Sequence, residues 1–178
     1  QKARDVGGFK FQQENGNQFL RYLGAHDVRL GQRISLEDNT NYILSLNIRT
    51  DDEEALLYLR ACNRQLIHPS EWNPRCFQFS EVVKSTKGKW KRMQFALNSG
   101  KVGSLKNYLQ APLIFTLSNR REYRFNLKPQ TVLDMDNISI LNVHGVEHIQ
   151  NGDFTSGIDN WFAYYDYNHL PWHIKNIW

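Results

Sequence analysis

Alternation of apolar and polar residues is the main local pattern in this chain. Residues 42–50 show it most clearly, because Tyr42, Leu44, Leu46 and Ile48 are separated by more polar positions, the period of a β-strand with one buried face. Similar runs predict strands at 19–23, 28–36, 56–62, 77–83, 90–97, 112–118, 123–127 and 131–141. Residues before 19 predict only a loose start, and a short helical turn is expected near 103–108. Roughly eight to ten strands at hairpin-like spacing predict an all-β sandwich.

The last long strand shows a change of phase. Leu133 and Met135 lie on one parity, whereas Ile138 and Ile140 lie on the other. One extra residue at Asp136-Asn137 would restore the alternation, so we expect a β-bulge there.

Size and charge narrow the class of protein. A chain of 178 residues is long enough to bury a core and predicts one domain. No apolar run approaches the roughly 18–20 residues of a membrane span, and the first residues do not resemble a signal peptide. A net charge of +4 and a pI near 9.1 permit contact with acidic glycans, lipid headgroups or nucleic acid without requiring any of them. The basic residues of one hairpin predict a solvated surface, or else a contact with acidic polysaccharide or phosphate headgroups. They are Lys84, Lys87, Lys89, Lys91 and Arg92.

The two cysteines flank a polar, proline-containing segment between two predicted strands. A Cys62–Cys76 disulfide would close this loop and would imply an oxidising compartment. Closing a loop of about 15 residues contributes on the order of 3 kcal/mol. Two reduced cysteines near the core are the alternative.

The sequence NGDFTSGIDNW at 151–161 resembles the opening of galactose-binding-like carbohydrate-binding jelly rolls, which consists of a strand, a turn and a buried Trp. Residues 131–142, TVLDMDNISILN, resemble the closing strand of the same family. The family's Gln–Leu–Tyr spacing and its Thr-x-x-x-Trp pattern also have counterparts, at Gln32, Leu36 and Tyr42 and at Thr86 and Trp90.

This order implies a jelly roll in which the opening strand is supplied from the C-terminus and lies beside the closing strand, as in a circular permutation. The alternative is a domain that ends near Asn142, followed by an incomplete second module that starts at Ile149.

The C-terminal segment, residues 151–178, resembles a segment of multi-pass bacterial membrane proteins related to surface-polysaccharide polymerases and ligases. The motifs that carry this resemblance are NGDF, GIDNWF and HLPWHIKN. This resemblance implies an extracytoplasmic location on the periplasmic face of the inner membrane, with a membrane nearby. Trp and Tyr favour such an interface.

Aromatic residues with polar neighbours are the candidates for glycan contact, because sugar rings stack on flat side chains while polar groups bond the hydroxyls. The candidate ligand-binding residues are Trp72, Arg64, His68, Tyr164, Tyr165, Tyr167, His169 and Trp172. We expect Trp90, Phe154 and Trp161 to lie in the core instead. Trp161 and Phe162 should anchor the aromatic tail.

Two acidic residues and one His-containing motif are the candidates for metal-binding sites. The jelly-roll resemblance implies that Asp136 and Asp153 approach each other and hold a structural calcium, although Thr155 replaces an acidic ligand. Two aspartates that cap turns are the alternative. HGVEH at 144–148 matches an inverted zinc-protease motif in form, but its glycine and strand context favour a polar connection. We expect no other cofactor.

The predicted function is a non-catalytic carbohydrate-binding or scaffold domain, the extracytoplasmic part of a bacterial membrane protein that handles surface polysaccharide. A glycan- or peptide-processing hydrolase and a purely structural module are the alternatives. The expected partners are a glycan or polysaccharide and a nearby membrane, with no nucleic acid.

Overall fold

The structure is a computed structural model, and it describes residues 8–23, 28–63, 76–101, 113–118 and 131–165. Every regular element in these ranges is a β-strand. The strands are β1 (Gly8–Glu14), β2 (Asn17–Leu23), β3 (Val28–Ile34), β4 (Asn41–Arg49), β5 (Glu54–Asn63), β6 (Cys76–Lys84), β7 (Lys91–Asn98), β8 (Leu113–Ser118), β9 (Val132–Asn142) and β10 (Phe162–Tyr165).

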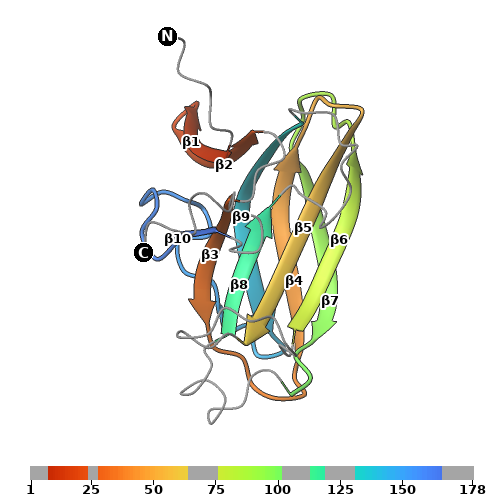
Figure 1. Ribbon diagram of the computed structural model, residues 1–178, viewed down its shortest axis with the longest axis vertical. Helices are drawn as coiled ribbons and strands as arrows, with labels where there is room; N and C mark the ends of the chain where they lie inside the picture. Colours follow the sequence, from red (N-terminus) through yellow and green to blue (C-terminus); the bar gives the residue numbers. More distant parts are fainter. Residues whose placement is uncertain (1–7, 24–27, 64–75, 102–112, 119–130, 166–178) are drawn as a thin grey trace, which may run out of the picture.

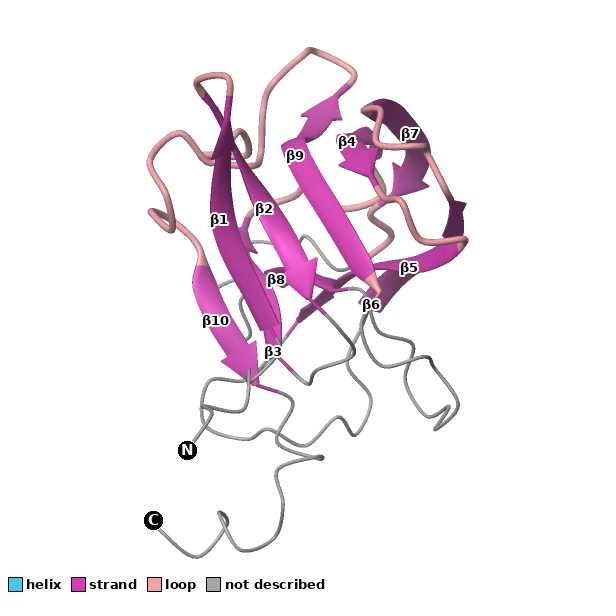
Figure 2. Cartoon of the chain, turned by 90° about the horizontal axis from the view of Figure 1, so that it is seen from above, coloured by secondary structure: helices cyan, strands magenta, loops and turns pink. Residues whose placement is uncertain are grey.

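The strands form two facing sheets of five strands each (Figures 1 and 2). We call the sheet with the order β1-β2-β9-β4-β7 sheet A, and the sheet with the order β10-β3-β8-β5-β6 sheet B. The paired strands are antiparallel throughout. The predicted all-β sandwich is therefore confirmed.

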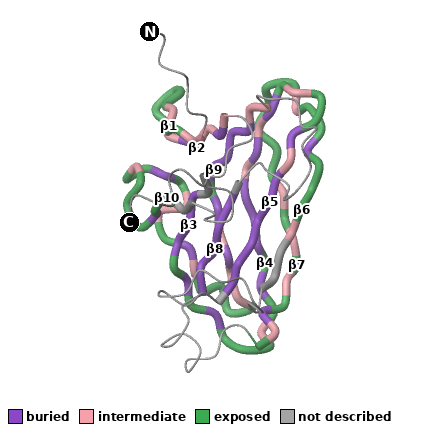
Figure 3. Tube along the Cα trace, viewed as in Figure 1, coloured by how far each residue is buried: buried purple, intermediate pink, exposed green. Residues whose placement is uncertain are grey.

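The core lies between the sheets, where alternate residues of each strand meet. On β4 the inward residues include Leu46 and Ile48, both with no exposed surface, and on sheet B Leu57 and Phe115 are equally buried. Figure 3 shows these buried stretches along the strands, with exposed residues at the turns. Fully burying one such side chain contributes about 1.5–3 kcal/mol, so the alternation read from the sequence is also the main source of stability.

One tyrosine joins the two sheets by hydrogen bonds through the core. The Tyr22 hydroxyl on β2 donates to the carbonyl of Leu117 at 2.8 Å and accepts from the amide of Leu30 at 2.9 Å. Because a buried hydroxyl without partners is costly, these two bonds allow a tyrosine at a fully buried position.

The predicted bulge is present in β9. Ser45 of β4 pairs with Ser139, but Asn47 pairs with Asp136, so β9 advances by one residue more than β4. Asn137 takes up the extra residue with φ 50°, in the left-handed region that asparagine tolerates.

The first strand was not predicted. β1 pairs with β2 through a two-residue turn at Asn15 and Gly16, whose φ values are 52° and 81°. Asn-Gly between two strands is the preferred sequence of a type I′ hairpin. Phe9 and Phe11 alternate before it and pack against the core, so the sequence carried this signal, although we interpreted it only as a turn.

Residues 151–161 correct the predicted opening strand. This segment consists of turns, with positive φ at Asn151, Phe154, Gly157 and Asn160, and such backbone cannot extend into a ladder. The strand begins one residue later, as β10, and β10 pairs with β3 in sheet B rather than with β9 in sheet A.

The 151–161 segment still contacts the closing strand, as the resemblance implied, but at one point. The amide of Ile138 donates to the carbonyl of Gly152 at 2.9 Å. A Cβ atom on Gly152 would lie 1.9 Å from the carbonyl oxygen of Ile138, so only glycine fits here. Phe154 and Trp161 are buried in the core, as expected. A circular permutation stays a prediction.

Candidate functional site

The outer face of sheet A presents many polar side chains to solvent. Because Tyr42, Leu44, Leu46 and Ile48 of β4 point inward, the residues between them point outward. The outward residues of the three strands β4, β7 and β9 are rich in amides and hydroxyls. They include Asn41, Ile43, Ser45, Asn47, Arg49, Arg92, Gln94, Ala96, Asn98, Asp134, Asp136, Asn137, Ser139 and Leu141.

Trp90 lies on this outer face and corrects the prediction that it belongs to the core. It is 36% exposed, and its ring packs edge-on against Phe19 with centroids 5.4 Å apart. The sequence held the information, because Met93 and Phe95 on β7 face inward and Trp90 has the opposite parity.

An arginine fixes the Trp90 ring. The Arg49 guanidinium carbon lies 4.6 Å from the Trp90 ring centroid and 4.9 Å from that of Phe19, which is cation–π distance. Phe19 is only 3% exposed, so the two rings and the guanidinium cover one another. One side of the indole is therefore occupied by protein while part of the ring remains open to solvent.

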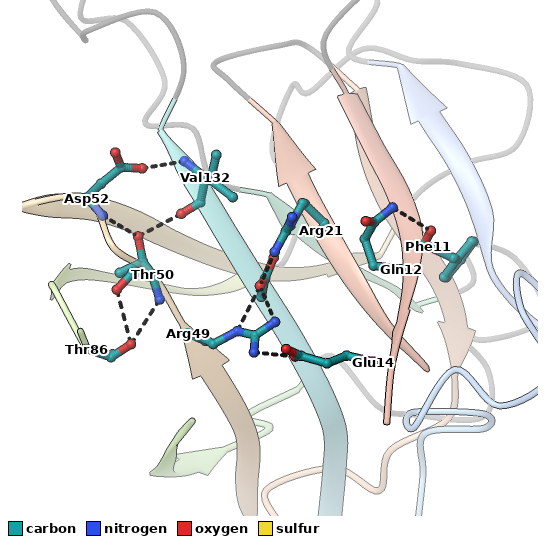
Figure 4. Close-up of polar contacts among 10 residues, drawn as sticks. Phe11, Gln12, Glu14, Arg21, Arg49, Thr50, Asp52, Thr86 and Val132 are labelled. Atoms are coloured by element: carbon teal, nitrogen blue, oxygen red, sulfur yellow. Dashed lines mark hydrogen bonds and ion pairs between the residues drawn. The ribbon is translucent and has the colours of Figure 1, made fainter. Parts of the chain in front are cut away.

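A buried carboxylate holds the arginines of this cluster (Figure 4). Asp134, 2% exposed, accepts two bonds from Arg21 at 2.6 and 2.8 Å and one from Arg49 at 3.0 Å. Arg49 also donates to Glu14 at 2.5 Å. The hydrogen bonds to Asp134 raise the pKa of Arg21, as expected for a charge-assisted, bidentate pair. The cluster is thus both charged and rigid.

The turn before β7 sets the position of Trp90. The amide of Thr86 donates to the carbonyl of Thr50 at 2.8 Å, and the hydroxyl of Thr86 accepts from the amide of Thr50 at 3.1 Å. The amide of Lys89 closes the turn on the carbonyl of Thr86 at 3.1 Å. Figure 4 shows how this threonine pair ties the turn to the end of β4. The Thr-x-x-x-Trp spacing is explained, since Thr86 anchors the turn that delivers Trp90 to the outer face.

Most of the predicted ligand-binding residues lie outside the described residues. This applies to Arg64, His68, Trp72, Tyr167, His169 and Trp172. Tyr164 and Tyr165 belong to β10, where their backbones pair with Arg29 and Val28, but their side chains are not described. These assignments stay predictions.

Asp136 and Asp153 are the two aspartates that the resemblance implies as calcium ligands. Their charges affect each other, but both carboxylates already accept hydrogen bonds from nearby protein groups. The carboxylate of Asp136 accepts from Asn17 at 2.9 Å and from the amide of Asn137 at 2.7 Å, and that of Asp153 accepts from Thr155. Burial raises the pKa of Asp136, and the charge of Asp153 adds to this. Within the described ranges no group of three or more His, Cys, Asp or Glu side chains could hold a metal. Calcium remains a prediction, and these contacts fit the alternative of two capping aspartates.

The HGVEH segment is a polar connection after β9, as its context suggested. The Glu147 carboxylate accepts from the amides of Ile140 and Ile149 and from the hydroxyl of Ser139. His148 bonds the carbonyl of Ser35 through Nδ1 at 2.7 Å. Both side chains therefore hold the turn together, and the glutamate is occupied as a structural acceptor.

The two cysteines lie on neighbouring strands. Cys62 of β5 is directly opposite Cys76 of β6, and antiparallel neighbours have Cα separations that suit a disulfide. This register is what the predicted bridge requires of the backbone.

No family model and no curated protein matches this chain. Three of the matching solved structures are as follows. One is the N-terminal tandem domain of two family 22 carbohydrate-binding modules from Paenibacillus barcinonensis Xyn10C, with 11% identity over 80% of this chain and 44% of that one and a TM-score of 0.53. A second is a family 16 carbohydrate-binding module, with 12% identity, 77% and 87% coverage and a TM-score of 0.45. The third is a carbohydrate-binding module of PbXyn10C, with 17% identity over 86% of this chain and 85% of that one and a TM-score of 0.48.

At such low identity the likeness concerns the fold alone. The chain has a jelly-roll β-sandwich fold like that of carbohydrate-binding modules, so the resemblance on which the fold prediction rested is confirmed at that level. The narrower resemblance of the C-terminal segment to polysaccharide polymerases and ligases is not among these matches.

Proposed function

We propose that this chain is a non-catalytic carbohydrate-binding domain that holds a polysaccharide on the outer face of sheet A. The observation that carries the proposal is the partly exposed Trp90, which packs against Arg49 and Phe19 on a sheet face that also carries amide and hydroxyl side chains. A fixed aromatic ring offers a flat apolar surface to the C–H face of a sugar. Asn47, Gln94 and Asn137 on the same sheet face can bond the sugar hydroxyls.

The jelly-roll fold supports the proposal but does not carry it, since one fold hosts many functions. The residues on the outer face of sheet A give the more specific support. A rigid aromatic contact with a few polar groups around it is the arrangement expected of a specific ligand surface, and its preorganisation by Asp134 and Glu14 lowers the entropy lost on binding.

The test is affinity electrophoresis of the purified chain through gels that contain soluble polysaccharides, both neutral and acidic. We expect retardation by at least one polymer, and Trp90→Ala should lose about 10-fold in affinity, at the upper end of aromatic contributions. Ile158→Ala is the matched control, because Ile158 is also exposed, at 46%, but lies in the 151–161 segment. Equal retardation of wild type and Trp90→Ala would remove Trp90 from the site, and no retardation by any polymer would favour a purely structural module.

We also propose an extracytoplasmic location, as part of a bacterial membrane protein that handles surface polysaccharide. The opposed cysteines support it, because their register on neighbouring strands allows a disulfide, and a disulfide indicates an oxidising compartment. The C-terminal resemblance supports the membrane context. Among the described residues, no helix is long and apolar enough to cross a bilayer.

Two measurements test this location. Thiol titration of the unfolded, unreduced chain should find no free thiol, and two free groups would contradict the bridge. Liposome co-sedimentation tests the membrane contact: Trp172→Ala should weaken association if the tail lies on a bilayer and leave it unchanged if the tail does not.

A further inference from the structure

The outer face of sheet A holds three arginines whose charges are met in different ways. Arg21 and Arg49 share the carboxylate of Asp134, and Arg49 also pairs with Glu14. Arg92 donates from Nη2 to the hydroxyl of Ser45 at 2.9 Å, which is a neutral partner. Among the described residues no carboxylate lies within ion-pair distance of Arg92. The charge of Arg92 is therefore oriented by a hydroxyl but not neutralised.

Arg92 is close to the proposed stacking surface. Trp90 immediately precedes β7 and Arg92 is its second residue, so both have the same outward parity, and a two-residue step along a strand spans about 7 Å. Directly opposite Arg92 on β4 is Asn47, and Gln94 follows on the same face. One oligosaccharide that stacks on Trp90 can thus reach Arg92 with an adjacent sugar.

A guanidinium in this setting is suited to a carboxylate. Its planar fork matches the two oxygens of a carboxylate, and it keeps its charge at every physiological pH. A ligand carboxylate at Arg92 has no protein carboxylate to displace, whereas at Arg21 or Arg49 it would compete with Asp134. The basic pI near 9.1 also favours the approach of an anionic chain.

We propose that Arg92 binds the carboxylate of an acidic sugar, so that the ligand of this face is a polysaccharide containing uronic acid. This inference rests on the proposed function, because it assigns a ligand class to the surface around Trp90. It makes Arg92 the residue that distinguishes acidic from neutral chains, while Trp90 contacts both.

The experiment compares uronate polymers with their neutral derivatives. Polygalacturonate, glucuronoxylan and hyaluronan are each tested as such and after chemical reduction of the carboxyl groups to hydroxymethyl groups. For a polymer that binds, the intact form should bind wild type about 3- to 5-fold more tightly than the reduced form, the range of an exposed ion pair. Arg92→Gln should abolish this difference and still bind the reduced form.

Lys10→Gln is the matched control, because Lys10 is an exposed cation of β1 at the far edge of the same sheet. It should keep the preference for the intact polymer. Thermal unfolding of both variants shows whether they fold like wild type.

Each other outcome overturns a defined claim. Equal binding of intact and reduced polymers by wild type overturns the inference about Arg92 but leaves the proposed function in place. An equal loss of preference in Lys10→Gln, or binding of dextran sulfate as tight as that of the uronate polymer, means general attraction of anions and overturns the assignment to a carboxylate. Failure to bind any polymer in either form overturns the proposed function, and the inference with it.

Discussion

The two outer faces of the sandwich differ in how far water reaches them. On sheet B, the outward residues of β5 and β8 are buried at the centre of the sheet: Tyr58 is 6%, Arg60 7% and Thr116 4% exposed. On sheet A, Ile43 at an outward position of β4 is 52% exposed, and Arg92 and Gln94 of β7 are exposed as well. Ser45 and Asp134 are buried on the outer side of sheet A as well, so a ligand can reach the part of this face around Ile43 and the edge strand β7, whereas the centre of sheet B is covered.

The sequence reflects this difference. Residues 56–62 are apolar on both parities in their first half, as in strands covered on both sides. Residues 42–50 and 91–98 alternate, with amides and hydroxyls on the outward parity, as in strands with one solvated face. The polarity of the outward residues thus tells which sheet has an open surface, and that surface is where a binding site should be sought.

The largest effect is expected from a pair of matched alanine substitutions, one on each outer face. Tyr58→Ala should lower the free energy of unfolding by about 3 kcal/mol, because it empties a filled space. Ile43→Ala should lower it by less than about 0.5 kcal/mol, because Ile43 is largely in water. Urea unfolding measures both. Similar losses in the two variants would mean that the outer faces are equally covered, contrary to the structure.

A second prediction concerns Asp134, whose carboxylate is buried although it lies on the outer face of sheet A. Asp134→Asn leaves Arg21 and Arg49 without their shared charge partner, and breaking a buried pair is costly. Because the Arg21 side chain is 30% exposed, water offsets part of this cost, and we expect a loss of about 1–3 kcal/mol in unfolding free energy.

The same Asp134→Asn variant should also shift the emission of Trp90, since Arg49 would no longer be fixed beside the indole. Arg92→Gln serves as the control, because Arg92 has no bond to this network. An Asp134→Asn variant as stable as wild type would show that the cluster does not stiffen the face.

The smallest effect is a pH dependence at the β9 bulge. Burial raises the pKa of Asp136 in the folded state, so folding favours its protonated form. The stability linked to this group is complete below its unfolded pKa and is lost as the pH rises through its raised folded pKa. Asp136→Asn should therefore gain stability relative to wild type between acidic and neutral pH. Thermal unfolding at several pH values measures the trend, and the opposite trend would indicate a bound cation beside this carboxylate.

Much of the fold could be predicted because strand periodicity is a local property. The strands on which alternation was clear, such as β4 and β7, appear within two residues of their expected bounds, and the bulge followed from the phase change between Met135 and Ile138. The 151–161 segment could not be predicted in the same way. Its resemblance to the opening of carbohydrate-binding jelly rolls suggested a strand and a turn, but the left-handed backbone at Asn151 and Phe154 depends on tertiary contacts that no local pattern shows.

The candidate site was predicted less well than the fold. Its centre is a contact of Trp90 with Phe19 and Arg49, residues far apart in the sequence that come together only when β2, β4 and β7 lie in one sheet. The parity of Trp90 on its strand would have placed it outward. Nothing local pairs Arg49 with Asp134, because that contact depends on the order of the strands in the sheet.

The 150–165 segment has a mechanical consequence. It is fastened to sheet A where Gly152 accepts from Ile138, and to sheet B where the side chain of Gln32 makes two 2.8 Å bonds to the backbone of Gln150. β10 then pairs with β3. A pulling force applied beyond Tyr165 therefore loads the β10–β3 pairing first, and the attachments at Gln150 and Gly152 take it up only after β10 has separated from β3. If the chain is held through its C-terminal side, as the proposed membrane context would require, the load enters through β10 in sheet B, while the outer face of sheet A, where we propose that the ligand binds, belongs to the other layer.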